Sequence, residues 1–192
     1  MIGGAESSEI FECKENVTQN APCFGLVMVT RHEWLAQPPI TPIDKLDLPA
    51  ENIILTDTKT EECVMKPNCK YLIRTLQDEH NLHNDDIAYN FLISSQGDIY
   101  EGRGWLLQSA EDSEKLMKTS YWIGLIGNFT NNNPIPETQV SAVQHFILQA
   151  KSSGKLISSP KVLCSENILI TNKFTDGFLN TSNKYMQCLN KD

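Results

Sequence analysis

The segment from residue 85 to residue 105 constrains the fold of this 192-residue chain more than any other. It reads DDIAYNFLISSQGDIYEGRGW, with apolar residues alternating before and after a Gln-Gly-Asp sequence. Alternation on both sides of a glycine-containing turn is typical of a β-hairpin. Tyr89, Phe91 and Ile93 are therefore predicted on one face of the first strand, and Ile99 begins the second.

The end of this segment, residues 102–105, combines residue types that often form a binding site. Gly102 and Gly104 lack Cβ atoms, so another group can approach the main chain closely on either side of Arg103. The planar guanidinium of Arg103 suits a carboxylate, and Trp105 offers a surface for stacking. The residues alone leave two plainer interpretations open, with Arg103 in a surface ion pair and with Tyr89 and Trp105 as aromatic residues of the core.

Elsewhere in the chain, apolar runs of strand length alternate with helical repeats. Strands are predicted around residues 26–29, 53–55, 121–126 and 161–164, and helices along 72–80, 140–150 and 175–185. This order predicts an α/β fold, with a central mixed β-sheet flanked by about three helices. We expect residues 1–24 to form a cysteine-bearing N-terminal segment and residues 25–192 a single domain.

Charge and hydropathy exclude several classes of partner. The formal net charge of −8 and the pI near 5.0 argue against nucleic acid and against an anionic membrane surface. No stretch approaches the roughly 20 apolar residues that span a bilayer, and the start Met1-Ile2-Gly3-Gly4 does not resemble a signal peptide. We therefore expect a secreted protein or an ectodomain that meets a membrane only through a segment not present in this sequence.

Cysteines and glycosylation sequons indicate an oxidising, extracellular compartment. The chain has six cysteines, and Asn-X-Ser/Thr sequons begin at Asn16, Asn128 and Asn180. Six cysteines allow about 15 pairings, which the sequence alone does not resolve. A metal site built from them is disfavoured because no C-x-x-C spacing occurs.

The hairpin segment resembles the central pattern of the peptidoglycan recognition protein family, DI-x-YNFLI-x-x-x-G-x-IYEGRGW. The similarity covers roughly residues 29–185, and further matching positions are Arg31-His32-Glu33-Trp34, Cys63, Cys69, Gln77, His80 and Ile126-Gly127-Asn128-Phe129. It implies the fold of the bacteriophage-type zinc amidases and a disulfide between Cys63 and Cys69. With that pair fixed, we predict Cys13–Cys23 and Cys164–Cys188 for the remaining cysteines.

Catalytic members of this family hold zinc with two histidines and one cysteine. The resemblance places Thr56, Ser165 and Lys173 at these three positions, with Thr171 fixing the register of the last two. A neutral hydroxyl binds zinc poorly, and a protonated lysine adds positive charge where a thiolate would balance the ion. Tyr89 matches the catalytic tyrosine, but without metal-activated water it has nothing to assist. We therefore predict no enzyme activity, no catalytic residue, no metal and no cofactor.

His80 and His83 lie one helical turn apart, before Asp85 and Asp86. This spacing is compatible with a metal ion, but it is more typical of a solvated helix end. The resemblance supports the second interpretation, because the family position that His80 matches is not a zinc ligand.

A second departure from the family lies between residues 106 and 120. Peptidoglycan-binding members have Gly-Ala-His where this chain has Ser109-Ala110-Glu111, followed by a charged run that can also be an ordinary solvated loop. Glu111 adds negative charge where a histidine faces the ligand, so a peptide carrying carboxylates should be repelled. In this family, an arginine at the position of Arg103 accompanies recognition of diaminopimelate-type stems. The residues predicted to contact ligand or partner are Thr56, Asp57, Tyr89, Arg103, Trp105 and Glu111.

These departures predict a non-catalytic coreceptor of innate immunity, similar to the ectodomains of certain insect membrane receptors. Such a domain dimerises with a ligand-loaded relative to sense diaminopimelate-type muropeptides. A receptor that binds the fragment in its own groove is the second interpretation, and a zinc amidase is the least favoured. A soluble decoy differs from a coreceptor only in what surrounds the domain, and the sequence leaves that choice open.

Overall fold

The computed structural model describes residues 28–110, 114–130, 132–164 and 186–188, with the last three as backbone only. The expected helix at 175–185 and several predicted functional residues lie outside these ranges. Those residues are Cys13, Asn16, Cys23, Glu111, Ser165, Lys173 and Asn180.

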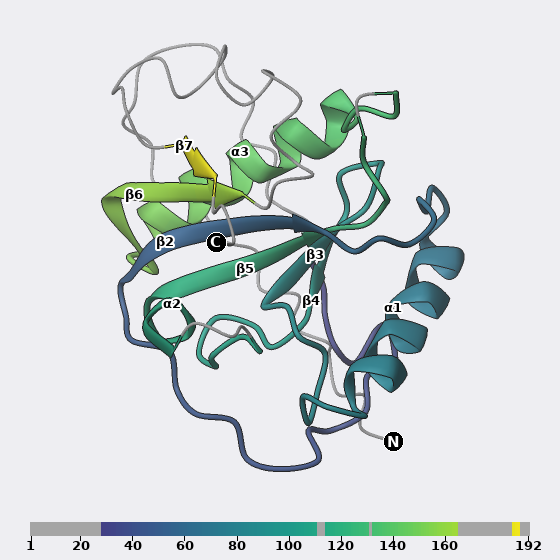
Figure 1. Ribbon diagram of the computed structural model, residues 1–192, viewed down its shortest axis with the longest axis horizontal. Coiled ribbons are helices and arrows are strands. Elements are labelled where there is room, and N and C mark those ends of the chain that lie inside the picture. The colour runs from purple at the N-terminus through teal and green to yellow at the C-terminus, as the bar shows by residue number, and fades with distance from the viewer. Residues whose placement is uncertain (1–27, 111–113, 131, 165–185, 189–192) are drawn as a thin grey trace, which may run out of the picture.

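A mixed sheet forms the centre of the molecule (Figure 1). Its strands are β1 (Met28–Val29), β2 (Ala50–Asp57), β3 (Phe91–Ile93), β4 (Ile99–Glu101), β5 (Ser120–Leu125), β6 (Leu156–Cys164) and β7 (Met186–Cys188). Their order in the sheet is β1-β4-β3-β5-β2-β6-β7. Only β3 and β4 run antiparallel, and every other neighbouring pair is parallel. The predicted mixed sheet is confirmed.

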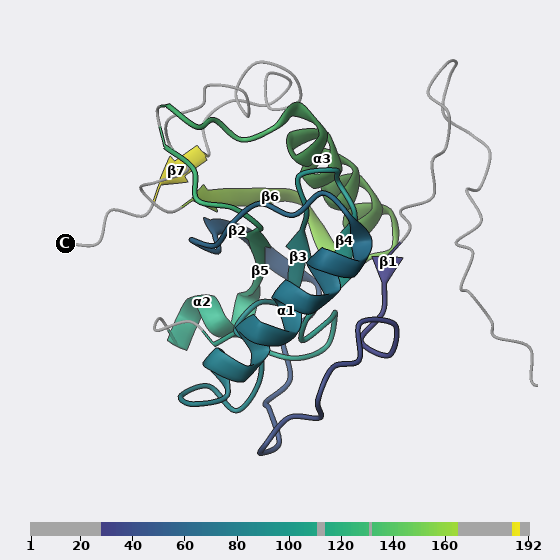
Figure 2. The same cartoon turned by 90° about the vertical axis from the view of Figure 1, so that its right-hand side faces the viewer.

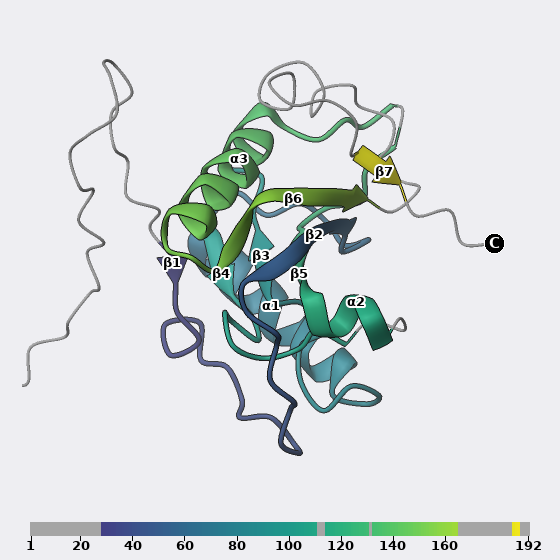
Figure 3. The ribbon, with the colours of Figure 1, turned by 90° about the vertical axis from the view of Figure 1, so that its left-hand side faces the viewer.

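Helices lie on both sides of this sheet. Helix α1 (Lys66–His80) and helix α3 (Glu137–Ser152) cover opposite faces, as Figure 2 shows. Both correspond to helices predicted from apolar repeats. The short helix α2 (Glu114–Thr119) lies beside β2 and β5, across the sheet from α3 (Figure 3). It falls in the 106–120 segment, so part of the charged run, for which a solvated loop was one interpretation, is helical.

The predicted hairpin is confirmed in β3 and β4, which pair from Phe91↔Glu101 to Ile93↔Ile99. Gly97 provides the turn with a φ of +85°, and a Cβ there would lie 3.0 Å from the main-chain oxygen of Thr138. The expected strand position of Tyr89 is wrong, because β3 begins only at Phe91.

Alternation along the strands divides the core into two layers. Ile53 and Leu55 of β2 face α3 and pack with Phe146. On the other face, Leu92 of β3 packs with Ile73 of α1. Helix α1 covers the sheet over β1, β4 and β3, but the same face of β2 and β5 remains outside that layer. The candidate site lies there.

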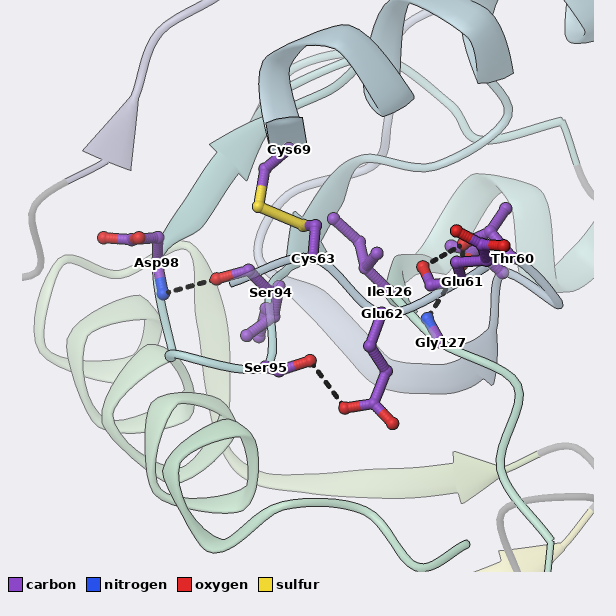
Figure 4. The surroundings of a disulfide bond; sticks show 12 residues. Thr60, Glu61, Glu62, Cys63, Cys69, Ser94, Ser95, Asp98, Ile126 and Gly127 are labelled. Carbon is purple, nitrogen blue, oxygen red and sulfur yellow. Dashed lines mark hydrogen bonds between the residues drawn. A yellow bond between two sulfur atoms is a disulfide. The ribbon is translucent and has the colours of Figure 1, made fainter. Parts of the chain in front are cut away.

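The disulfide between Cys63 and Cys69 is confirmed. It joins the loop after β2 to the first turn of α1 (Figure 4). Close by, Ser95 Oγ in the hairpin turn donates a hydrogen bond to Glu62 Oε2 (2.8 Å). The loop that follows β2 is therefore held to both α1 and the hairpin.

The backbone is also compatible with the predicted disulfide between Cys164 and Cys188. Cys164 is buried at the end of β6, and the parallel pairing of β6 with β7 places Cys188 directly opposite. Neighbouring strands lie about 4.8 Å apart, within the range of Cα separations that a disulfide bridges. The Cys164–Cys188 bridge stays a prediction.

Candidate functional site

A pocket of about 280 Å³ opens where β2 ends beside the segment that precedes β3. Its lining residues come from four segments of the chain and are Thr56, Asp57, Thr58, Lys59, Ala88, Tyr89, Ala110 and Trp122. Three of the predicted contact residues, Thr56, Asp57 and Tyr89, are thus brought together. Glu111 lies outside the described residues, directly after Ala110.

The floor of this pocket is the uncovered face of β2 and β5. Thr56 pairs with Gly124 in the register of these strands, and Trp122 lies two residues earlier on β5. Gly124 makes room for an aromatic ring, because a Cβ there would lie 3.0 Å from the ring of Tyr89 and 3.2 Å from Thr58 Cγ2. The pleat of β2 turns the side chain of Asp57 toward the opposite face, which it shares with Leu55.

One wall is the turn after β2. The hydroxyls of Thr58 and Thr60 share a hydrogen bond of 2.7 Å, and Gly127 N–H donates to Thr58 Oγ1 (3.1 Å). Between them, Lys59 adopts a left-handed φ of 56°, which costs a side-chain-bearing residue roughly 1 kcal/mol or more. Lys59 is exposed, so the turn presents an ammonium group at the pocket edge.

The opposite wall, Ala88 and Tyr89, is held by His80 at the end of α1. Ala88 N–H donates to His80 Nδ1 (3.0 Å), and the His80 and Tyr89 rings meet edge to face at 5.5 Å. Burial lowers the pKa of His80, and Arg103 acts in the same direction, while Glu79 and Asp86 oppose the change. The hydrogen bond from Ala88 requires an unprotonated Nδ1, so this contact depends on a neutral imidazole.

Arg103 supports this wall from behind and does not line the pocket. The residue is 7% exposed, and its guanidinium donates to three main-chain oxygens, those of Ile87 (2.7 Å), Gln108 (3.0 Å) and Asn84 (2.6 Å). Burial lowers its pKa, with the carboxylate of Asp86 opposing. The alternative interpretation of Arg103 as part of a surface ion pair does not hold, because the side chain is buried. A direct contact between Arg103 and a ligand stays a prediction.

Gly102 and Gly104, on either side of Arg103, are closely packed against other atoms of the protein. A Cβ at Gly102 would lie 2.2 Å from the main-chain oxygen of Tyr89, and one at Gly104 would lie 3.0 Å from Glu101 Oε1. Arg103 N–H donates to the same Tyr89 oxygen (2.9 Å). The glycines therefore allow the chain after β4 to pack against the pocket wall.

A second network, centred on the buried Asp86, fixes the segment that leads into the wall of Ala88 and Tyr89. Asp86, 1% exposed, forms an ion pair with Arg31 (3.0 Å) and accepts hydrogen bonds from the Gln77 side chain and the Ile87 amide (both 2.7 Å). Arg31 also donates to the main-chain oxygen of Gly102 (2.7 Å). Several residues of the family pattern thus act as structural supports for the wall.

Trp105 lies on the far side of the sheet from the pocket. Its indole stacks on Phe146 of α3 (5.0 Å between centroids, 6° between planes) and contacts Phe91 at 4.5 Å. It packs against the core layer under α3. The structure therefore favours the core interpretation of Trp105, and Trp105 is not among the residues that line the pocket with Thr56, Asp57 and Tyr89.

Trp122 and Asn90 are site residues that the sequence prediction missed. Asn90 Oδ1 accepts from Trp122 N–H (2.9 Å), and Asn90 N–H donates to Trp122 O (2.9 Å), so the Trp122 main chain is fixed on both sides. Trp122 Nε1 is buried and has no hydrogen-bond partner among the described residues. The apolar run 121–126 predicts a strand, but it does not show which face is open.

The described residues that line the pocket include no histidine and no cysteine. Thr56 is the one predicted zinc-ligand position that is described, and its hydroxyl donates to the main-chain oxygen of Asp57 (3.3 Å). Over the described ranges, no three His, Cys, Asp or Glu side chains lie together as a metal-binding group. A neutral hydroxyl such as that of Thr56 is a poor zinc ligand, and the absence of a metal stays a prediction.

The fold and pocket define a domain of the amidase type. Residues 47–173 match the profile of the N-acetylmuramoyl-L-alanine amidase family, Amidase_2. The chain belongs, more narrowly, to the peptidoglycan recognition protein family. It is 35% identical over 146 residues to the peptidoglycan recognition protein of Trichoplusia ni, covering 75% of this chain and 79% of that protein.

Two further relatives are longer than this chain. Peptidoglycan-recognition protein LC of Drosophila melanogaster is 33% identical over 155 residues, which are 76% of this chain and 29% of that protein. Peptidoglycan recognition protein 4 of Mus musculus is 33% identical over 148 residues, covering 74% and 38%. The chain thus spans well under half the length of each.

Solved structures agree with the fold. The ectodomain of the Drosophila transmembrane receptor PGRP-LCa matches with a TM-score of 0.68 and 32% identity, covering 71% of this chain and 83% of that one. PGRP-LCa in complex with PGRP-LCx and tracheal cytotoxin gives a TM-score of 0.68 at 28% identity, covering 72% and 83%. Among the described residues, no helix is long and apolar enough to cross a membrane.

Proposed function

We propose that this chain is a non-catalytic peptidoglycan recognition domain that acts as a coreceptor. It joins a ligand-loaded relative and thereby senses a diaminopimelate-type peptidoglycan fragment. The observation that carries the proposal is the pocket beside Tyr89, which offers a hydroxyl at Thr56 where catalytic relatives would hold a zinc ligand. A sugar-peptide fragment would be held mainly by the partner.

The relatives support this kind of assembly. The solved complex of two family ectodomains, PGRP-LCa and PGRP-LCx, contains tracheal cytotoxin. Tracheal cytotoxin also occurs in the structure of PGRP-LE, where it is described as a monomeric diaminopimelic acid-type peptidoglycan. The Cys63–Cys69 disulfide supports an extracellular location, either as the ectodomain of a membrane receptor or as a secreted protein.

The absence of activity is proposed on the chemistry of the ligand positions. Thr56, Ser165 and Lys173 would offer two hydroxyls and an ammonium in place of two imidazoles and a thiolate. Metal analysis of the purified chain, together with a peptidoglycan digestion assay with and without added Zn²⁺, tests this. We expect no stoichiometric zinc and no cleavage, and zinc-dependent cleavage would overturn the proposal.

Association with a relative is the central test. The chain is mixed with a candidate sister domain, with and without a monomeric diaminopimelate-type muropeptide, and analysed by size-exclusion chromatography. We expect a complex only when the fragment is present. A lysine-type muropeptide, which lacks the additional carboxylate, is the matched ligand control and should not support the complex. Association that is independent of the fragment contradicts the proposal.

A receptor that binds the fragment by itself is the second candidate, favoured by the presence of a pocket beside Tyr89. Calorimetry on the isolated chain separates the two, because the coreceptor should show no binding tighter than about 100 μM. The variant E111Q tests the predicted repulsion at the pocket edge, since it removes charge and keeps size. It should strengthen any residual binding, whereas tight binding by the unmodified chain would favour the direct receptor.

A further inference from the structure

We propose that Trp122 and Lys59 form a carboxylate-binding subsite in the pocket, with the Trp122 indole N–H and the Lys59 ammonium as its donors. This inference rests on the proposed function, and it specifies which chemical group of a peptidoglycan fragment the pocket accepts. The group is a carboxylate at the end of a short peptide stem. Neither residue was among the predicted contact residues.

The indole N–H is the first observation. Trp122 lines the pocket, its main chain is fixed by Asn90, and its Nε1 has no acceptor within the described part of the chain. A buried donor without a partner is unfavourable, because it has lost water and gained nothing in return. An oxygen acceptor brought by a ligand would remove this deficit.

The remaining lining groups favour an acceptor that carries negative charge. Among the described lining residues, Lys59 contributes the one cation. The hydroxyls of Thr56 and Thr58 already bond to neighbouring protein groups. Of the same described residues the one acid is Asp57, and the pleat of β2 places its side chain on the face under α3. Both of its carboxylate oxygens are buried there without a hydrogen-bond partner in the described part of the chain. The pocket therefore presents donors and a positive charge, which suit a carboxylate better than an ammonium group.

The left-handed backbone of Lys59 is an independent observation. Its φ of 56° is maintained by the bonds of Thr58 and Thr60 on either side, in a loop that the Cys63–Cys69 disulfide ties to α1. Strained positions of this kind concentrate at binding sites. The exposed side chain of Lys59 can reorient, so its ammonium can meet a carboxylate that enters the pocket.

The test uses the isolated ¹⁵N-labelled chain and two small probes, N-acetylalanine and N-acetylalaninamide. The first carries a carboxylate, and the second is its neutral amide. The chain has three tryptophans, so it gives three indole N–H signals, and the variant W122F identifies the one from Trp122. We expect N-acetylalanine to shift the Trp122 signal selectively, with a dissociation constant on the order of millimolar and at least fivefold tighter than for the amide.

Variants separate the two donors. K59M should weaken N-acetylalanine binding about fivefold and leave the amide unchanged, because it removes charge and keeps the length of the side chain. W122F should weaken both probes about tenfold. K151M, on α3 across the sheet, is the matched control and should bind like the unmodified chain.

The proposal is overturned if neither probe moves the Trp122 signal, if all three indole signals move alike, or if K59M and K151M bind N-acetylalanine equally. Loss of the fold by W122F is detected in the same spectra, and K59M then carries the test alone. Because the titration contains no partner domain, its failure is distinguishable from a failure of the chain to associate with a relative.

Discussion

The two faces of the sheet are built from alternate residues of the same strands, yet they differ in chemistry. Under α3, the residues are apolar and closely packed, with Phe91, Trp105, Tyr121 and Phe146 in one aromatic group. On the other face, α1 covers only part of the sheet, α2 lies beside β2 and β5, and the pocket floor is a further part of that face. The first face therefore sets the stability of the domain, and the second leaves a place for a ligand or partner.

The largest effect is expected where this comparison predicts the most rigid packing. Phe146 is fully buried and contacts three aromatic rings, so F146A should lower the free energy of unfolding by about 3–5 kcal/mol. Urea denaturation followed by tryptophan fluorescence measures it. L148A on the same helix, where Leu148 is 45% exposed, should change stability by less than about 0.5 kcal/mol. A loss below about 1.5 kcal/mol for F146A would contradict the assigned role of the α3 face.

The second prediction concerns the pocket wall. R103K keeps the charge but loses the planar fork that serves three carbonyls, and we expect a loss of about 2–4 kcal/mol. Hydrogen exchange should show faster exchange for the amides of residues 87–89. R74K is the matched control, because Arg74 donates one bond, to the main-chain oxygen of Trp34 (3.3 Å), and it should cost much less.

R103K also separates structural support from ligand contact. If the variant is as stable as the unmodified chain but no longer joins a relative in the presence of the muropeptide, Arg103 contacts the ligand directly. If Arg103 only supports the pocket wall, R103K should lower the free energy of unfolding, and its association with a relative should weaken in proportion to that loss.

A smaller effect is expected on the pocket floor. G124A introduces a methyl group 3.0 Å from the Tyr89 ring, and the overpacking should cost about 1–2 kcal/mol. The same change in a Y89A background should cost less, because only the 3.2 Å contact with Thr58 Cγ2 remains. Urea midpoints of the four proteins measure the coupling. Equal costs of G124A in both backgrounds would mean that Gly124 is required for another reason.

The parts of the fold that local periodicity determines could be predicted from sequence. The hairpin follows from alternation around Gly97, and α3 follows from apolar residues at helical spacing that end before Gly154. The disulfide Cys63–Cys69 followed from the family resemblance. In each case the signal lies within a few residues of the element that it specifies.

The site depends on contacts between distant segments, and here prediction from sequence was weaker. Arg103 is buried because three carbonyls from residues 84, 87 and 108 converge on it, which no local pattern indicates. The sequence does not distinguish Trp105 from Trp122 as a core or an exposed aromatic residue. In the structure, Trp105 packs under α3 and Trp122 lines the pocket. The two side chains lie on opposite faces of the sheet, and Trp122 lines a pocket because α1 does not extend over its part of the sheet.

The last and smallest expected effect is a pH dependence at the wall that His80 supports. Burial lowers the pKa of His80 in the folded chain, whereas in the unfolded chain histidine titrates near pH 6.5. Above about pH 6.5 both states are neutral and the contribution to stability is fully present. As pH falls below that value, the unfolded state binds a proton first, so stability declines until the pH falls below the folded pKa.

Protonation would also place a donor at Nδ1, against the N–H of Ala88, and release the wall from α1. H80Q keeps an acceptor that cannot titrate in this range, so the difference in urea midpoint between pH 7.5 and pH 5.5 should shrink relative to the unmodified chain. H145Q, which changes an exposed histidine on α3, should leave that difference as it is. If H80Q and H145Q give the same pH dependence, the wall beside Tyr89 is not supported by a neutral His80. The contrast between a rigid α3 face and an adjustable pocket face then has no support from the contact between His80 and Ala88.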